Sequence, residues 1–178
     1  MVANKHFVVY IPDDLPLDAS APLLCVGISV YGPLRFYELD KLGKHVGVVR
    51  LGGLGHVAVK FAKAMGVKVT VVRAAISTMD GIIDTVSAPH ALEPLIGLLK
   101  TNGKVVLIGC LEKPLELPVF PLLMGRKIVG GYASGGMTET QEMLYFASQH
   151  NIAAYIDVIT MEYLNTAMDR LAKGDIRY

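Results

Sequence analysis

The stretch HVGVVRLGGLGHVAVKFAKAMGVKVTVV, residues 45–72, decides the fold of this chain. Its opening valines are typical of a buried strand, and the glycines that follow lead into a segment whose apolar residues recur at helical spacing. Gly66 ends this predicted helix, and Val67–Val72 is a second β-branched run. Strand, glycine turn, helix and strand predict a nucleotide-binding βαβ unit, because glycines let backbone N–H groups approach a pyrophosphate and a helix N-terminus favours its charge.

The glycine turn departs from the dinucleotide-binding pattern G-x-G-x-x-G at its first position. The six residues are Arg50-Leu51-Gly52-Gly53-Leu54-Gly55, so the second and third glycines are present and an arginine replaces the first. An arginine there can contact phosphate, or it can obstruct the tight turn and fill the crevice. We expect the obstruction to outweigh the contact.

Length and composition exclude several classes of protein. The chain has 178 residues, 52% hydrophobic residues, 19% charged residues and a net charge of +1, which indicates one soluble globular domain. No basic patch suggests a nucleic-acid partner, and no apolar run approaches the ~20 residues of a membrane span. The first residues, MVANKHFVVYIPDD, contain no apolar leader segment. Cys25 and Cys110 form no C-x-x-C pair, so neither a disulfide scaffold nor a zinc knuckle is expected and a cytoplasmic location is the default.

Strands alternate with helices along the rest of the chain, which favours a parallel doubly wound α/β sheet. Further strands are expected at Phe7–Ile11, Gly81–Val86, Lys104–Gly109, Lys127–Gly131 and Ile156–Ile159. Helices are expected at Pro22–Tyr31, His90–Leu99, Thr138–His150 and Met161–Lys173, and an extended stretch at Pro114–Pro121. Thr138 and Gln141 have the spacing of a capping box. Asp80 and Asp84 are interpreted as cap and turn residues, not as a catalytic pair.

Seven stretches carry a resemblance to a known family: PLDASAPLLCVGISVYGPL, GLGHVAVKFAKAMGVKVTV, TMDGIIDTVSAPH, EKPLELPVFPL, GRKIVGG, GGMTETQEML and LNTAMDRLAKGDIRY. They resemble the plant cinnamyl alcohol dehydrogenases and their sinapyl and mannitol dehydrogenase relatives, which are zinc-containing medium-chain dehydrogenases. The match runs through nearly all of this chain but covers only part of the family's length. It implies hydride transfer between NADP(H) and a small alcohol or aldehyde of the cinnamyl type, in the lignin pathway. It also implies a catalytic zinc between a catalytic domain and a Rossmann domain.

The resemblance also implies which residues serve the metal and the cofactor. Cys25 stands at a zinc-ligand position, and Ser29 at the position of a threonine that contacts the cofactor. The other implied cofactor residues are the motif Arg50, Leu51, Gly52, Gly53, Leu54 and Gly55, the cleft residues Thr85 and Gly109, and the nicotinamide-end loop Tyr132, Ala133 and Ser134. Arg73 ends the second strand, where NADP enzymes tolerate a cation, or it is simply the residue at a deletion joint.

Departures from the family pattern divide the chain into three expected parts. Residues 1–44 are expected to be a remnant of the catalytic domain and its linker, without the family's other zinc ligands. Residues 45–155 are expected to form a shortened Rossmann-like NADP-binding domain of about five strands, with an internal deletion near 73–77. Residues 156–178 are expected to return to the catalytic domain. Cys25 alone cannot hold zinc, which needs three protein ligands in a catalytic site, so Cys25 and Cys110 are expected to be buried apolar residues.

Two readings of function follow. In the first, the chain is the cofactor half of an NADP(H)-dependent zinc alcohol dehydrogenase. In the second, it is a catalytically inactive relic without a complete zinc site. A homodimer through the sheet edge near Lys127–Gly131 is implied by the resemblance in both cases. Zinc content measured together with cinnamyl alcohol oxidation separates the two readings.

Overall fold

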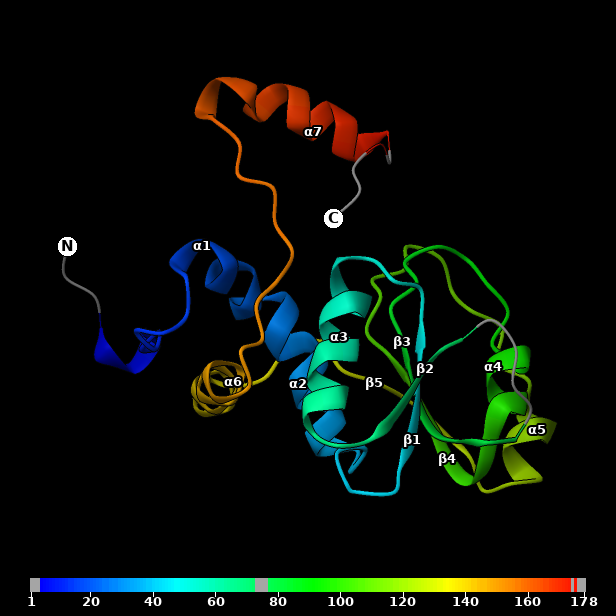
Figure 1. The fold of residues 1–178 in the computed structure, drawn as a ribbon. Helices are drawn as coiled ribbons and strands as arrows, with labels where there is room; N and C mark the ends of the chain where they lie inside the picture. Colours follow the sequence, from blue (N-terminus) through cyan, green and yellow to red (C-terminus); the bar gives the residue numbers. More distant parts are fainter. Residues whose placement is uncertain (1–3, 73–76, 174, 176–178) are drawn as a thin grey trace.

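A five-stranded parallel sheet forms the centre of the protein in a computed structural model that describes residues 4–72, 77–173 and 175 (Figure 1). The strand order is β2-β1-β3-β4-β5. The strands are β1 (His45–Val49), β2 (Lys68–Val71), β3 (Met79–Asp84), β4 (Leu99–Leu107) and β5 (Ile128–Gly131). Each pairs in parallel with its neighbour, so the predicted Rossmann-like α/β sheet is confirmed. β1 lies between β2 and β3, which excludes a β2–β3 hairpin.

Helices cover both faces of the sheet. On one face lie α2 (Val26–Phe36), α3 (Gly53–Ala64) and α6 (Met137–Gln149), and on the other lie α4 (Glu93–Leu98) and α5 (Val119–Leu123) (Figure 1). Each face buries its own hydrophobic cluster. Strand side chains alternate between the two clusters, as the pleat requires: Ile83 and Val106 join the first and Ile82 and Val105 the second.

Aromatic packing joins the three helices of the first face. Phe61 of α3 is fully buried, and its ring centroid lies 5.4 Å from that of Tyr31 in α2 and 6.0 Å from that of Phe146 in α6. The phenol of Tyr31 donates a 2.7 Å hydrogen bond to Glu142 of α6. Residues that precede and follow the βαβ unit are therefore part of its core, and α2 is not an appendage of it.

The terminal segments contain short helices. They are the 3-10 turns η1 (Lys5–Phe7), η2 (Ala21–Leu24) and η3 (Met161–Tyr163) and the helices α1 (Leu17–Ser20) and α7 (Leu164–Ala172). α7 lies apart from the sheet at the end of an extended segment (Figure 1). Among the described residues, no single helix is both long enough and apolar enough to span a membrane. The helical segments Leu17–Leu24 and Val26–Phe36 reach that length and hydropathy only when taken together, and they are bent by 54°.

Several predicted elements are wrong or shifted. Phe7–Ile11 and Ile156–Ile159 form no strand in the described structure, because β-branched residues need a partner strand and neither stretch lies beside the sheet. The helix expected from His90 begins at Glu93, the strand expected from Lys104 begins at Leu99, and α5 interrupts the extended stretch Pro114–Pro121.

The N-cap predicted at Thr138 is also wrong. Helix α6 begins at Met137, one residue earlier, with Gly136 as its N-cap. A carboxylate oxygen of Glu139 accepts the backbone N–H of Gly136 at 2.7 Å, so a glutamate three residues after the cap does the reciprocal bonding that was expected of Gln141. The side-chain amide of Gln141 instead bonds to the backbone of Tyr10: its oxygen accepts the Tyr10 N–H and its nitrogen donates to the Tyr10 carbonyl oxygen.

Strand β2 is an edge of the sheet. Its end residues Lys68 and Val71 are exposed, and Val71 is 37% exposed. The expected deletion joint at 73–77 falls largely on residues 73–76, which lie outside the described residues. Arg73 lies outside them too.

Candidate cofactor site

The carboxyl ends of the parallel strands meet at one edge of the sheet. From β1 the chain continues to β2 on one side, while β3 lies on the other side of β1. A reversal of this kind is the switch point at which ligands bind in open α/β sheets. The predicted residues Arg50, Thr85 and Gly109 follow β1, β3 and β4 at this edge.

The glycine motif forms the start of α3 with its amides uncovered. Gly52 is the N-cap and offers no side-chain cap. A Cβ built on Gly53 has nothing within 4 Å, so the space beside the first helical turn is open among the described residues. At Gly55 a Cβ would collide with the carbonyl oxygen of Arg50. Gly55 is therefore needed for close packing of helix on strand, and the open space at Gly53 fits a pyrophosphate.

Arg50 adopts the backbone conformation that the motif reserves for glycine. Its φ is 66°, in the left-handed region, and its side chain is exposed. Its Nε lies 3.9 Å from the position that a Cβ on Gly52 would take, so the arginine side chain lies beside the cap residue of α3. The Thr85 hydroxyl, which follows β3, donates to the Val49 carbonyl oxygen at 2.8 Å and lies 3.2 Å from the Arg50 carbonyl oxygen. It therefore holds the turn that follows β1.

The loop after β5 is fastened to α2. The Ser29 hydroxyl donates to the Ala133 carbonyl oxygen at 2.8 Å, and the Tyr37 hydroxyl donates to that of Gly131 at 3.1 Å. Gly32 leaves space for the ring of Tyr132, which a Cβ there would fill. Burial raises the pKa of Tyr132, and Glu139 adds to the rise.

The structure brings most of the predicted nicotinamide-end residues together. A hollow of about 340 Å³ lies where β4 and β5 end, between Gly109 and Tyr132 with Ala133. Ser134 is exposed and bonds only weakly to its neighbour Gly135, at 3.5 Å. In the motif, Leu51 is 42% exposed, whereas Leu54 packs against the core.

The predicted metal position is not surrounded by a set of zinc ligands in the described part of the chain. Cys25 is exposed, as is Cys110, so the prediction that both are buried is wrong. Within residues 4–72, 77–173 and 175, no three His, Cys, Asp or Glu side chains are grouped so that they could bind a metal ion. The donors present therefore do not fit the family's zinc.

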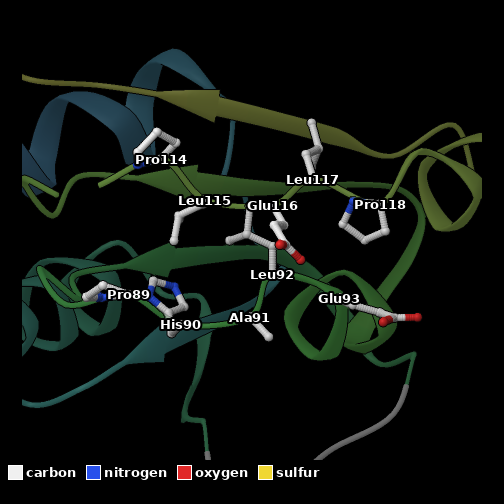
Figure 2. A pocket seen from close by; sticks show the side chains of 10 residues that line it. All are labelled: Pro89, His90, Ala91, Leu92, Glu93, Pro114, Leu115, Glu116, Leu117 and Pro118. Carbon is white, nitrogen blue, oxygen red and sulfur yellow. The ribbon is translucent and has the colours of Figure 1, made fainter. Parts of the chain in front are cut away.

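A second hollow lies away from the glycine motif. It has a volume of about 590 Å³ and separates the residues that lead into α4 from the extended segment 114–118. Figure 2 shows His90 and Leu92 on one side of it and Leu115 and Glu116 on the other. We call it the α4 groove. Sequence reasoning missed it, because nothing in the spacing of these residues shows that the two segments lie side by side.

The segment that follows α6 is attached to the motif helix. Lys60 of α3 donates to the Ala153 carbonyl oxygen at 2.6 Å, and its ammonium lies 3.6 Å from the ring centroid of Tyr155. Tyr155 stacks on His56, and its backbone N–H donates to His56 Nε2 at 3.2 Å. These contacts fix the extended segment on α3 one turn beyond the glycines.

The chain resembles a dehydrogenase family model over part of its length and several longer proteins over all of it. A protein-family model described as "Zinc-binding dehydrogenase" matches residues 73–149. The chain is 62% identical to a probable mannitol dehydrogenase of Fragaria ananassa and 53% identical to cinnamyl alcohol dehydrogenase 7 of Arabidopsis thaliana, in each case over 100% of its length. It spans 57% and 58% of these two relatives.

Solved structures agree with the sequence relatives. A cinnamyl alcohol dehydrogenase from Sorghum bicolor superposes with a TM-score of 0.92 at 46% identity, covering 98% of this chain and 57% of that one. A cinnamyl alcohol dehydrogenase from Helicobacter pylori, solved in complex with NADP(H), gives a TM-score of 0.86 at 35% identity, with 97% and 57% covered.

The relatives are longer inside the matched region as well. The alignments span 206 positions against 178 residues in this chain, which leaves 28 positions at which the chain has no residue. The expected internal deletion near 73–77 and the expected domain boundaries at 44 and 155 stay predictions.

Proposed function

Because the chain is homologous over its whole length to the cinnamyl and mannitol dehydrogenases of the zinc-binding dehydrogenase family, we propose that it is the NADP(H)-binding half of an alcohol dehydrogenase. The observation that carries the proposal is the uncapped start of α3 at the switch point, with open space at Gly53. An inactive relic is less favoured, since relatives at 53–62% identity over the whole chain are named as dehydrogenases.

Two observations support NADP(H) as the dinucleotide. The Helicobacter pylori relative binds NADP(H). The chain also has Val72-Arg73 after β2, without the acidic residue that contacts the ribose in NAD enzymes. When bound, NADPH would supply a hydride to an aldehyde, and NADP⁺ would accept one from an alcohol.

The chain's own residues bind and orient the cofactor in this proposal. The first amides of α3 hold the pyrophosphate, and Thr85 holds the turn at Arg50 in place. The loop of Tyr132 and Ala133, fastened by Ser29, lies against the nicotinamide end. No step is assigned to zinc, since the described residues do not fit it.

The substrate class follows from the relatives at a coarse level. Their names indicate small alcohols and aldehydes, and we include the cinnamyl type in the proposal on the sequence resemblance. A cytoplasmic location is also proposed.

A homodimer through the β5 edge completes the proposal. Ile128 of β5 is 46% exposed, and Phe120 and Leu123 of the neighbouring α5 are 70% and 69% exposed. Apolar side chains beside an unpaired strand edge are typical of a surface that pairs with another chain. The mass in solution tests this interface. A wild-type mass of a dimer and an Ile128→Lys mass of a monomer would support it, and a monomeric wild type would refute it.

Cofactor titration combined with turnover tests the proposed function. NADPH fluorescence should change saturably on addition of the chain, and NADH should bind more weakly. Oxidation of cinnamyl alcohol with NADP, measured with zinc content, then reports whether this chain alone carries activity. Failure of both nucleotides to bind would refute the proposal.

A further inference from the structure

Asp84, at the carboxyl end of β3, is a buried carboxylate that makes two bonds. Its side chain is 1% exposed, and Oδ2 lies 2.7 Å from Nε2 of His90. The other oxygen, Oδ1, accepts the backbone N–H of Val86 at 3.0 Å. Nδ1 of His90 lies 2.8 Å from the carbonyl oxygen of Ala88. Both ring nitrogens face acceptors, so only the imidazolium form donates a hydrogen bond to each.

The same aspartate joins the loops at the cofactor edge. Its backbone carbonyl oxygen accepts the N–H groups of Ile108 and Gly109, at 3.0 and 3.3 Å, where the chain leaves β4. A Cβ on Gly109 would collide with the carbonyl oxygen of Val86. The next residue, Thr85, holds the turn after β1. The loops that follow β1, β3 and β4 are therefore all fixed to residues 84–86.

His90 shares the α4 groove with two other titratable side chains of the described chain. His90 lines the α4 groove with 20% of its side chain exposed, so solvent reaches it. The remaining titratable groups lining the groove are Glu93 at the start of α4 and Glu116 on the extended segment (Figure 2). Burial lowers the pKa of His90, but the Ala88 carbonyl and the Asp84 carboxylate outweigh it, and the pKa lies above the ordinary value of 6.5.

We propose that Asp84 and His90 are a positioning pair for the cofactor. While His90 is protonated, the pair holds the loops of Thr85 and Gly109 in the arrangement that binds NADP(H), and loss of the proton loosens both loops. The inference rests on the proposed function, because the pair acts on that same site. It acts through the loops and not by touching the cofactor.

The role of the pair is tested by the dissociation constant of NADPH. Fluorescence measures it at pH 6 and at pH 9 for the wild-type chain and for His90→Gln. At pH 6 the variant should bind about fivefold more weakly than the wild type, the lower end of the usual range for coupled sites. The ratio should fall towards one as the pH rises to 9, because the wild-type imidazolium loses its proton and the variant has none to lose. Titration of the ligand's own phosphate cancels in this ratio.

Glu116→Gln is the matched control, because it removes a carboxylate from the opposite side of the same groove. Its ratio to the wild type should be about one at both pH values. If His90→Gln also gives a ratio of one at both, the pair does not position the cofactor. If its ratio at pH 9 equals that at pH 6, His90 has a structural role only, and the proposal is overturned.

Amide hydrogen exchange in the cofactor-free chain separates this inference from the proposed function. Relative to wild type, His90→Gln should speed exchange at Val86 and Ile108 at pH 6 and not at pH 9. This result in a chain that does not bind NADPH would refute the proposed function and support the loop positioning. Unchanged exchange at pH 6 would overturn the positioning itself.

Discussion

Replacing Arg50 with glycine changes both the stability and the cofactor affinity of this chain. Arginine at φ 66° is strained by about 1–2 kcal/mol relative to glycine. The greater freedom of glycine in the unfolded chain offsets about 0.5–1 kcal/mol of that gain. Arg50→Gly should therefore raise the free energy of unfolding by about 0.5–1 kcal/mol, which urea denaturation measures.

Cofactor affinity changes for a separate reason, because the strain is already present in the free protein. The Arg50 side chain lies beside Gly52, where the pyrophosphate approaches. Ordering or displacing it costs about 0.5–1.5 kcal/mol on binding. An exposed ion contact with phosphate recovers only about 0–1 kcal/mol. The net gain is about 0.5 kcal/mol, so NADPH should bind about two- to threefold more tightly to Arg50→Gly, as followed by its fluorescence.

Arg50→Ala is the matched control, because it removes the long side chain and keeps the strained φ. It should tighten NADPH binding as much as Arg50→Gly, without the gain in stability. Equal or weaker binding by both variants would show that the guanidinium is a phosphate ligand, and the reasoning would be refuted.

The remaining predictions concern packing and pH. Gly55→Ala should lower the free energy of unfolding in urea by about 1–3 kcal/mol and abolish NADPH binding, because its Cβ meets the Arg50 carbonyl oxygen. Gly53→Ala, whose Cβ has free space, should change the free energy of unfolding by less than about 1 kcal/mol. Phe61→Ala should cost about 3–5 kcal/mol of unfolding free energy, and a cost below about 1 kcal/mol would contradict the core described here. The pKa of Asp80 is lowered, since burial raises it but its bonds to Lys100, to the His45 N–H and to Lys44 outweigh that effect. Asp80→Asn should therefore lose about 1–2 kcal/mol at pH 7, and the loss should disappear as the pH falls below the ordinary value of 3.8; an equal loss at pH 7 and pH 3 would contradict this.

The sheet was predictable because its strands are short apolar runs between glycines and charged residues. The parallel doubly wound sheet followed from the alternation of strands and helices, and the structure agrees. Isolated β-branched runs misled at Phe7–Ile11 and Ile156–Ile159, because local pattern does not show whether a partner strand exists. The cap of α6 was misplaced by two residues, since Glu139 three residues after Gly136 and Gln141 three residues after Thr138 both fit the spacing rule.

The cofactor site was predictable only in part. The glycine motif and the arginine that replaces its first glycine came from one contiguous stretch. Contacts such as Ser29 with Ala133, 104 residues apart in the sequence, depend on the packing of α2 on the sheet. Asp84 was interpreted as a turn residue, and its bond to the Val86 N–H agrees, but its pairing with His90 depends on a loop whose shape the sequence does not encode locally.

Amide hydrogen exchange of the whole chain with and without saturating NADPH tests the central claim most directly. Bound NADPH should slow exchange at the start of α3, around Gly53–Gly55, and in the loops that carry Thr85 and Tyr132. Exchange in α7, which lies apart from the sheet, should not change. Protection absent from the start of α3, or confined to other parts of the chain, would contradict a cofactor site at the switch point of this sheet.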